Sequence, residues 1–272
     1  MKVQIIAEIG INHNGDLDIC KKIIDSAVLA GCDYVKFQKR NPDICVPEAQ
    51  KNKIKQTPWG EMSYLDYKKK IEFGKDQYDE IDKYCKEKNI GWFASVWDND
   101  SIEFMSRYNT ITKIPSALIT NSSLIENARK NFDFLIISTG MSTEKEIEKC
   151  VSICNPDVIM HTNSTYPSPI EQLNLEYITH LKNKYNKEIG YSGHEYGLVT
   201  TFATIPLGVK WVERHVTIDR TMWGSDQVAS VETAGLIKLV KGIRDIEKAL
   251  GGNKNRELLP SEIEKLKSLR GI

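Results

Sequence analysis

Two histidines in the last third of the sequence are placed where they could bind a metal. His194 ends the run EIGYSGH (188–194) and His215 lies in WVERHVT (211–217), and both runs are typical of buried strands. On neighbouring strands the two imidazoles could approach one divalent ion without backbone distortion. Glu213, on the same face as His215, could orient that ring or supply an oxygen. Such donors suit Mn²⁺, Fe²⁺, Co²⁺ or Zn²⁺. The alternative is two histidines bonded to neighbouring loops.

Two lysines lie within apolar runs. Lys36 is flanked by Val35 and Phe37, and Lys113 precedes Ile114. A lysine in such a run must find a counter-anion or emerge at the end of its strand. With hydroxyls at the ends of other runs, the pair would form a cradle for a phosphate and a carboxylate. Those hydroxyls belong to Ser95, Ser116, Ser138 and Ser192. One lysine could instead be the Schiff-base nucleophile of an aldolase, and spacing does not separate the two readings.

Strand-like and helix-like patterns alternate along the whole chain. The expected strands are 3–9, 34–38, 91–97, 111–116, 134–139, 158–163, 188–194 and 211–217. The expected helices are 18–30, 77–88, 98–108, 122–130, one capped by Ser142 or Thr143, then 171–185, 198–207 and 231–250. Eight consecutive βα units predict an α/β fold, a single-domain (β/α)₈ TIM barrel over residues 1–252. A doubly wound open sheet is the alternative, and no glycine-rich dinucleotide or P-loop fingerprint supports it.

Two segments depart from this alternation. Residues 40–74 form a long connection after the second strand, and we expect either a lid or substrate-binding loop or a packing insert there. Residues 253–272 are charged, contain Pro260 and add no strand. They are expected to be a tail, a linker-like segment or a short surface helix.

Composition excludes several classes of protein. The chain has 272 residues, is 40% apolar, and balances 37 basic against 37 acidic side chains, which argues against wholesale disorder, nucleic-acid binding and a polybasic membrane protein. No apolar run approaches the ~20 residues needed to span a bilayer. The N-terminal apolar stretch is short and broken by Glu8, unlike a signal peptide. Six cysteines without metal-ribbon spacing suggest free thiols in a reducing cytoplasm.

Reactive side chains fall at the expected carboxyl ends of the strands, where the active sites of such barrels lie. They are Glu8, Lys36 with Gln38, Ser95, Lys113 with Ser116, Ser138, His161 with Asn163 and Ser164, Ser192 with His194, and Glu213 with His215. Each one has a structural explanation by itself, as a helix cap or a hydrogen-bonded core residue. Their convergence on one rim favours a functional site.

Several long motifs, in register along the chain, resemble the sialic acid synthase family. They are AEIGINHNGDLD (7–18), VKFQK (35–39), TPWGEMSYLDYKKKIEF (57–73), ISTGM (137–141), TYPSP (165–169), GYSGHE (190–195) and ERHVTIDRTMWGSDQVASVE (213–232). Members of that family condense phosphoenolpyruvate with N-acetylmannosamine or its 6-phosphate. The resemblance implies a (β/α)₈ barrel and an enzyme that forms a nine-carbon 2-keto-3-deoxy sugar acid. A homodimer is the family expectation.

The resemblance also implies roles for individual residues. His194 and His215 would hold a divalent metal, usually Mn²⁺, with Mg²⁺ or Co²⁺ as alternatives. Phosphoenolpyruvate would be held by Lys36, Ser95, Lys113, Ser116, Ser138, Ser164 and Ser192. Glu8 matches a carboxylate near the metal-bound water, and Tyr166 and Asp226 match residues that contact the sugar. Catalysis would then rest on Glu8, Lys36, Lys113 and His215.

The sequence departs from the family pattern in two places, and both concern the acceptor sugar. KIPSALI (113–119) stands where members commonly read KIGSGE or KVGSGD, so Leu118 replaces an acidic sugar contact. The sequence ends at LLPSEIEKLKSLRGI (258–272), where a linker to a C-terminal antifreeze-like domain would begin. The contact that this domain makes with the N-acyl group would then be absent, come from elsewhere in this chain, or come from another polypeptide. A synthase for another aldose and a non-catalytic sugar-binding paralogue are the remaining alternatives.

Overall fold

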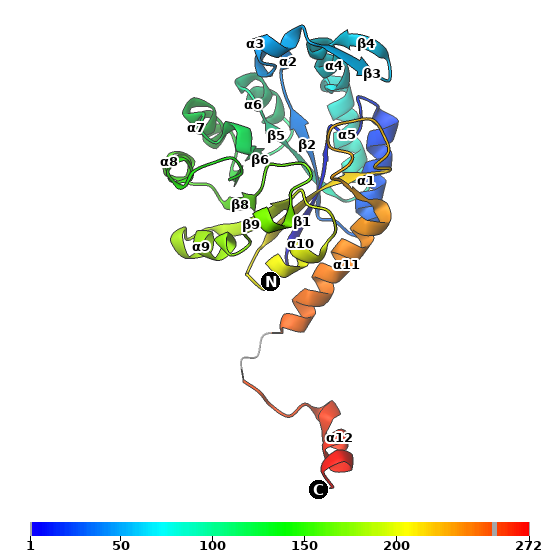
Figure 1. The fold of residues 1–272 in the computed structure, drawn as a ribbon, viewed down its shortest axis with the longest axis vertical. Coiled ribbons are helices and arrows are strands. Elements are labelled where there is room, and N and C mark those ends of the chain that lie inside the picture. The colour runs from blue at the N-terminus through cyan, green and yellow to red at the C-terminus, as the bar shows by residue number, and fades with distance from the viewer. Residues whose placement is uncertain (1, 252–254, 272) are drawn as a thin grey trace.

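Eight parallel strands close into a barrel in this computed structural model, which describes residues 2–251 and 255–271 (Figure 1). They are β1 (Gln4–Gly10), β2 (Tyr34–Lys39), β5 (Gly91–Val96), β6 (Ile111–Ile114), β7 (Phe134–Ser138), β8 (Val158–Thr162), β9 (Glu188–Gly193) and β10 (Trp211–Thr217). Each strand pairs with the next in parallel, and β1 pairs with both β2 and β10, which closes the ring. The predicted (β/α)₈ barrel and all eight of its strands are confirmed. A short strand, β11 (Val231–Glu232), pairs in parallel with the end of β10 and is not part of the closed ring.

Helices follow the barrel strands and cover their outer face. They are α1 (Leu17–Ala30), α5 (Lys75–Glu87), α6 (Asn99–Met105), α7 (Ser122–Asn131), α8 (Glu144–Cys154), α9 (Tyr177–Lys184), α10 (Val199–Thr204) and α11 (Thr233–Leu250). The expected cap at Thr143 is present, because the Glu146 carboxylate accepts from the Thr143 amide at 2.7 Å. The helix expected from residue 171 begins at Tyr177 instead. The residues before it form a 3₁₀ turn, Ile170–Gln172, directly after Pro169.

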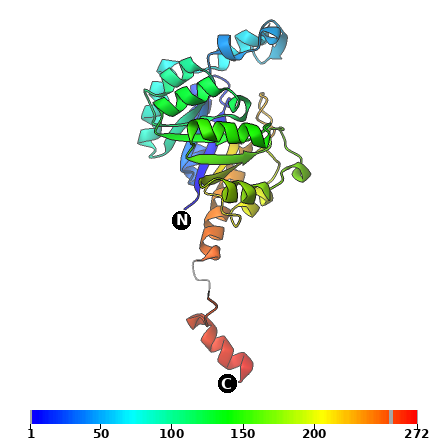
Figure 2. The ribbon, with the colours of Figure 1, turned by 90° about the vertical axis from the view of Figure 1, so that its left-hand side faces the viewer.

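Residues 40–74, here called the cap, form a small substructure beyond the carboxyl ends of the strands (Figures 1 and 2). The cap contains α2 (Pro42–Cys45), α3 (Glu48–Lys51), an antiparallel hairpin of β3 (Ile54–Thr57) and β4 (Gly60–Ser63), and α4 (Tyr64–Ile71). Tyr67 and Ile71 of α4 are buried with Ile11 from the β1–α1 loop. The Tyr67 ring also meets Trp223, from the loop after β10, edge to face at a centroid distance of 5.0 Å.

Two apolar layers stabilise the barrel, one outside the ring of strands and one inside it. The outer layer lies between the strands and the helices. The inner layer fills the floor of the barrel with side chains such as Ile6, Phe93, Ile136 and Trp211. Because successive side chains of a strand alternate between its two faces, the inward positions after Ile6, Phe93 and Ile136 are Glu8, Ser95 and Ser138. The barrel interior is therefore apolar at its floor and polar at its carboxyl end.

The end of the chain carries one more helix, α12 (Pro260–Arg270), which buries none of its side chains and stands away from the barrel in Figures 1 and 2. The expected tail 253–272 contains this helix, whereas residues 252–254 and 272 lie outside the described residues. Within the described residues, no helix combines the length and the apolar character needed to cross a bilayer.

Candidate active site

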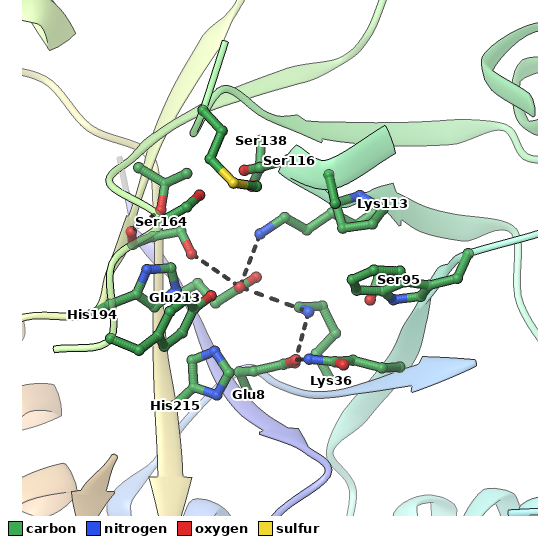
Figure 3. A pocket seen from close by; sticks show the side chains of 18 residues that line it. Glu8, Lys36, Ser95, Lys113, Ser116, Ser138, Ser164, His194, Glu213 and His215 are labelled. Atoms are coloured by element: carbon green, nitrogen blue, oxygen red, sulfur yellow. Dashed lines mark hydrogen bonds and ion pairs between the residues drawn. The ribbon is translucent and has the colours of Figure 1, made fainter. Parts of the chain in front are cut away.

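A cavity of about 180 Å³ opens at the carboxyl ends of the barrel strands (Figure 3). It brings together every residue to which the resemblance assigns a role, except Asp226. These are Glu8, Lys36, Ser95, Lys113, Ser116, Ser138, Ser164, Tyr166, Ser192, His194 and His215. The convergence that the sequence predicted for the rim is therefore present for these residues.

Two buried lysines and two buried carboxylates form one network in this cavity (Figure 3). Lys36 Nζ lies 2.7 Å from Glu8 Oε2 and 3.7 Å from Glu213 Oε1. Lys113 Nζ lies 2.9 Å from the same Glu213 oxygen, which also accepts from Ser192 Oγ at 3.1 Å. Glu213 was expected to orient His215 or to supply a ligand oxygen. Its carboxylate is instead turned into the barrel, where it pairs with the two lysines.

The pKa values in this network follow from burial and from the opposite charges. Burial opposes the charge on Lys36, but the carboxylates of Glu213 and Glu8 outweigh it and raise the pKa of Lys36. Burial lowers the pKa of Lys113, and the positive charge of Lys36 adds to that effect despite Glu213. Burial would raise the pKa of Glu213, yet Lys113 and Lys36 hold it at about 2. Glu213 is therefore ionised at neutral pH.

A row of hydroxyl groups borders the lysines on the side formed by β6, β7 and β8. Ser116 Oγ accepts from the Gly140 amide at 3.0 Å, and the buried Ser138 Oγ has no hydrogen-bond partner among the described residues. A Cβ atom on Gly140 would lie 2.1 Å from Ser164 Oγ and 2.9 Å from Ser116 Oγ. Only glycine therefore lets these two hydroxyls approach each other. Unsatisfied and convergent hydroxyls of this kind suit an anionic ligand.

His194 and His215 face each other at the opposite side of the cavity, with ring centroids 5.3 Å apart. The Asn163 carbonyl lies 2.6 Å from His194 Nδ1, so Nδ1 carries the proton and Nε2 keeps a free lone pair. Burial, and then the charge of His215, lower the pKa of His194 to about 3. His215 Nδ1 is buried and has no hydrogen-bond partner within the described part of the chain.

These two imidazoles fit a divalent metal ion by their chemistry. His194 is held neutral with one nitrogen available, and His215 presents an unpartnered nitrogen. Among the described residues no group of three or more His, Cys, Asp or Glu side chains is placed to hold a metal. Protein ligation would therefore come from two imidazoles, and water or substrate oxygens would fill the remaining positions.

Asp226 and Tyr166 lie at the mouth of the site. The Tyr166 ring packs against His194, with ring centroids 4.0 Å apart and ring planes inclined at 31°. Asp226 does not line the cavity, although its Oδ2 is 3.7 Å from His215 Nδ1. A Cβ atom on Gly10 would lie within 4 Å of Asp226, Glu8 and Gln38, so this glycine keeps a narrow space between them open.

Three residues discussed from the sequence turn away from the cavity. His161 lies on the outer face of β8, where its Nε2 pairs with the Leu173 carbonyl at 2.7 Å. The Asn163 side chain donates to the Gln172 carbonyl and accepts from Thr165. Leu118 packs against the outer apolar layer, and Ala117 borders the cavity in its place. The period of a strand accounts for His161, because its neighbours Met160 and Thr162 face inward.

Sequence reasoning gave too little weight to two cavity residues. Gln38 donates to Glu8 Oε1 at 2.9 Å and accepts from Arg40. Trp97 follows β5 and presents a buried Nε1 without a partner among the described residues. Each lies two positions after a predicted site residue, Lys36 or Ser95, and so shares its inward face. The period-2 pattern could have identified both.

Comparison with known proteins gives consistent matches. The profile of the NeuB family matches residues 23–255. Human N-acetylneuraminate-9-phosphate synthase is 36% identical over 95% of this chain and 74% of its own length. N,N'-diacetyllegionaminic acid synthase of Campylobacter jejuni is 34% identical over 92% of this chain and 78% of its own. The crystal structure of N-acetylneuraminic acid (sialic acid) synthetase from Leptospira borgpetersenii, in complex with citrate, superposes with a TM-score of 0.87 and 32% identity, covering 100% of this chain and 93% of that one.

Proposed function

The chain belongs to the NeuB family, and on that premise we propose that it condenses phosphoenolpyruvate with an N-acylated hexosamine. The product is a nine-carbon 2-keto-3-deoxy sugar acid of the sialic acid type, and phosphate is released. The observation that carries this proposal is the cavity in which Lys36 and Lys113 lie between a row of hydroxyls and the imidazoles of His194 and His215, each with a nitrogen available to a metal. The named relatives, which are synthases of nonulosonic acids, support it.

The lysines and hydroxyls are assigned to phosphoenolpyruvate. Its phosphate and carboxylate match two ammonium groups and the convergent hydroxyls of Ser116, Ser138 and Ser164. Because Lys36 and Lys113 are already held by Glu8 and Glu213, they are fixed in position before the substrate arrives. Catalysis by such groups is electrostatic, since they need no reorganisation as charge moves.

The histidine side of the cavity is assigned to the acceptor. A divalent ion bound there by His194 and His215, which we propose to be Mn²⁺, would act as a Lewis acid toward the open-chain aldehyde. Tyr166, which packs against His194, and Asp226, beside His215, border the space that the sugar would occupy. Mg²⁺ and Co²⁺ are the alternatives to compare.

The reaction forms a carbon–carbon bond and a carbon–oxygen bond to water, and it breaks the carbon–oxygen bond to the phosphate. The alkene carbon of phosphoenolpyruvate attacks the aldehyde carbon, whose oxygen takes up a proton. Water then adds at the phosphate-bearing carbon and gives a proton to Glu8, which we assign as the general base. In the collapse of the tetrahedral intermediate, the hydroxyl derived from water loses its proton and becomes the keto oxygen, while the bond to the phosphate oxygen breaks and phosphate leaves with that electron pair and a proton. The Gln38 amide, which donates to Glu8, orients that carboxylate.

Phosphate release is the direct test. Purified protein is incubated with phosphoenolpyruvate, Mn²⁺ and a panel of N-acylhexosamines, free and 6-phosphorylated, and inorganic phosphate is measured. We expect release only when both substrates are present, and a keto acid of the summed carbon skeleton. Borohydride should trap no substrate on Lys36 or Lys113. Absence of release with every hexosamine, or trapping on either lysine, would contradict the proposal.

A further inference from the structure

A second cavity lies beside the catalytic one, between the cap and the end of β5. Its volume is about 190 Å³, and Arg40, Tyr64, Lys68 and Trp97 are among its lining residues. Trp97 also lines the catalytic cavity, so the two spaces share a wall. Arg40 continues this connection, because it donates to Gln38, which in turn donates to the catalytic Glu8.

Two cations face this cavity without a carboxylate partner. Among the described residues, neither Arg40 nor Lys68 forms an ion pair with an acidic side chain. Arg40 stacks on Trp97 at 4.1 Å, and Lys68 Nζ lies 5.3 Å from the Tyr64 ring centroid and 5.2 Å from that of Tyr67. Burial, and then the charge of Arg40, lower the pKa of Lys68 to about 8. Unpaired, partly buried cations that repel one another are the setting in which an anion is stabilised.

The other polar groups of the cavity are consistent with an anionic ligand. Trp97 Nε1 is buried, and no described residue accepts a hydrogen bond from it. Glu72 also lines the cavity, but its carboxylate accepts from Lys39 Nζ at 2.9 Å and from the Arg40 amide at 3.1 Å. Asp226 is the second acidic group near Lys68, and it lies outside the lining of this cavity. The polar lining of the cavity therefore combines two unpaired cations, a buried N–H and the Tyr64 hydroxyl with a single carboxylate, Glu72, whose Oε1 is held by Lys39 and the Arg40 amide.

We propose that this cap cavity binds a phosphomonoester at the end of the acceptor sugar that lies farthest from its aldehyde. The inference rests on the proposed function and deepens it, because it makes the acceptor a hexosamine 6-phosphate rather than a free sugar. Lys68 and Arg40 contact the phosphate oxygens, and Trp97 donates to one of them. A phosphate bound by two cations and a buried N–H is held by charge-assisted hydrogen bonds.

Steady-state kinetics with matched acceptors test this inference. For the unmodified chain we expect kcat/KM at least about 10-fold higher with N-acetylmannosamine 6-phosphate than with N-acetylmannosamine. Lys68→Gln should raise KM for the phosphorylated acceptor about 10-fold and leave KM for phosphoenolpyruvate unchanged. Lys70→Gln is the matched control, because Lys70 lies on the same helix and is exposed. Thermal melting of each variant checks that it is folded.

Calorimetry separates failure of this inference from failure of the proposed function. Binding of the sugar 6-phosphate is measured directly, and Lys68→Gln should weaken it about 10-fold while Lys70→Gln leaves it unchanged. Equal use of free and phosphorylated sugars, with equal losses for both in Lys68→Gln, would overturn the phosphate subsite and leave the synthase activity standing. No turnover with any acceptor, together with Lys68-dependent binding, would overturn the reaction and keep the subsite.

Discussion

Lys113 and Glu213 form an ion pair across the barrel, with Nζ and Oε1 2.9 Å apart, although their strands are not neighbours in the ring. The pair joins β6 to β10 through the interior, and Lys36 approaches the same carboxylate oxygen from β2. Because Ser192 of β9 donates to this oxygen as well, side chains of four strands meet at one oxygen atom. The network is also balanced in charge, as the whole chain is, because the two ammonium groups lie against the carboxylates of Glu8 and Glu213.

Removal of the shared carboxylate should destabilise the barrel. Glu213→Gln leaves Lys36 and Lys113 buried with one carboxylate between them, and breaking a buried pair in this way typically costs about 3–5 kcal/mol. We expect a loss of that size in the free energy of unfolding, measured by urea denaturation, together with a fall in phosphate release. Glu103→Gln is the control, because Glu103 pairs with Arg107 at the exposed surface and should cost under about 1 kcal/mol. Equal effects of the two variants would show that the network contributes no stability.

His13 should make the protein sensitive to mild acid. Its ring is buried and stacks on Phe73 at 3.9 Å, and burial lowers its pKa from 6.5 to about 3. Between about pH 3 and pH 6.5, His13 is therefore protonated in the unfolded chain and neutral in the folded chain. Stability from this group is complete above about pH 6.5 and is lost as the pH falls toward 3, by about 2 kcal/mol at pH 5.

One variant tests the acid sensitivity. His13→Asn keeps an acceptor for the Gly15 amide but cannot titrate, so its free energy of unfolding should fall less between pH 7.5 and pH 5 than that of the unmodified chain. Its stability at pH 7.5 should be lower, since the stacked ring is lost. An unchanged slope in His13→Asn would contradict the assignment.

Gly140 should control the binding of phosphoenolpyruvate. An alanine Cβ at this position would collide with Ser164 Oγ at 2.1 Å and crowd Ser116 Oγ at 2.9 Å. We expect Gly140→Ala to displace both hydroxyls and to raise KM for phosphoenolpyruvate about 10-fold, with a smaller effect on KM for the sugar. Gly74→Ala is the control, because a Cβ there meets only Gln77 Oε1, at 3.4 Å. A rise in KM for the sugar alone would contradict the assignment of these hydroxyls to phosphoenolpyruvate.

Metal removal should abolish turnover if the two imidazoles hold an ion. Dialysis against a chelator should stop phosphate release, and Mn²⁺ should restore it. His194→Ala and His215→Ala should each weaken Mn²⁺ binding more than about 10-fold in calorimetry, since each removes one of two protein ligands. His180→Ala, on the outer helix α9, should bind Mn²⁺ as the unmodified chain does. If both His194→Ala and His215→Ala bind Mn²⁺ with unchanged affinity, these two histidines do not hold the metal.

The regular parts of the fold could be predicted because each strand and helix has its own periodicity. All eight barrel strands and their order followed from it, and the rim residues followed from the strand ends. The role of Glu213 could not be predicted, since it depends on partners about 100 and 177 residues away along the chain, Lys113 and Lys36. His161 was misplaced for a different reason: its type drew attention, although its position in β8 turns it outward. The cap has short elements whose packing on Trp223 is set by tertiary contact.

The cap leaves the barrel after β2 and returns before α5, which leads into β5, and β2 and β5 are hydrogen-bonded neighbours. Both of its ends are therefore anchored at one seam of the ring, while Glu8, Lys113, Glu213 and the two histidines come from other strands. An exchange of cap sequence or length would leave the strand order and those residues untouched. In evolutionary terms, the acceptor-phosphate subsite that we propose in the cap is separable from the barrel residues, and a chimaera carrying a relative's cap is expected to change the preference for a phosphorylated acceptor without changing those residues.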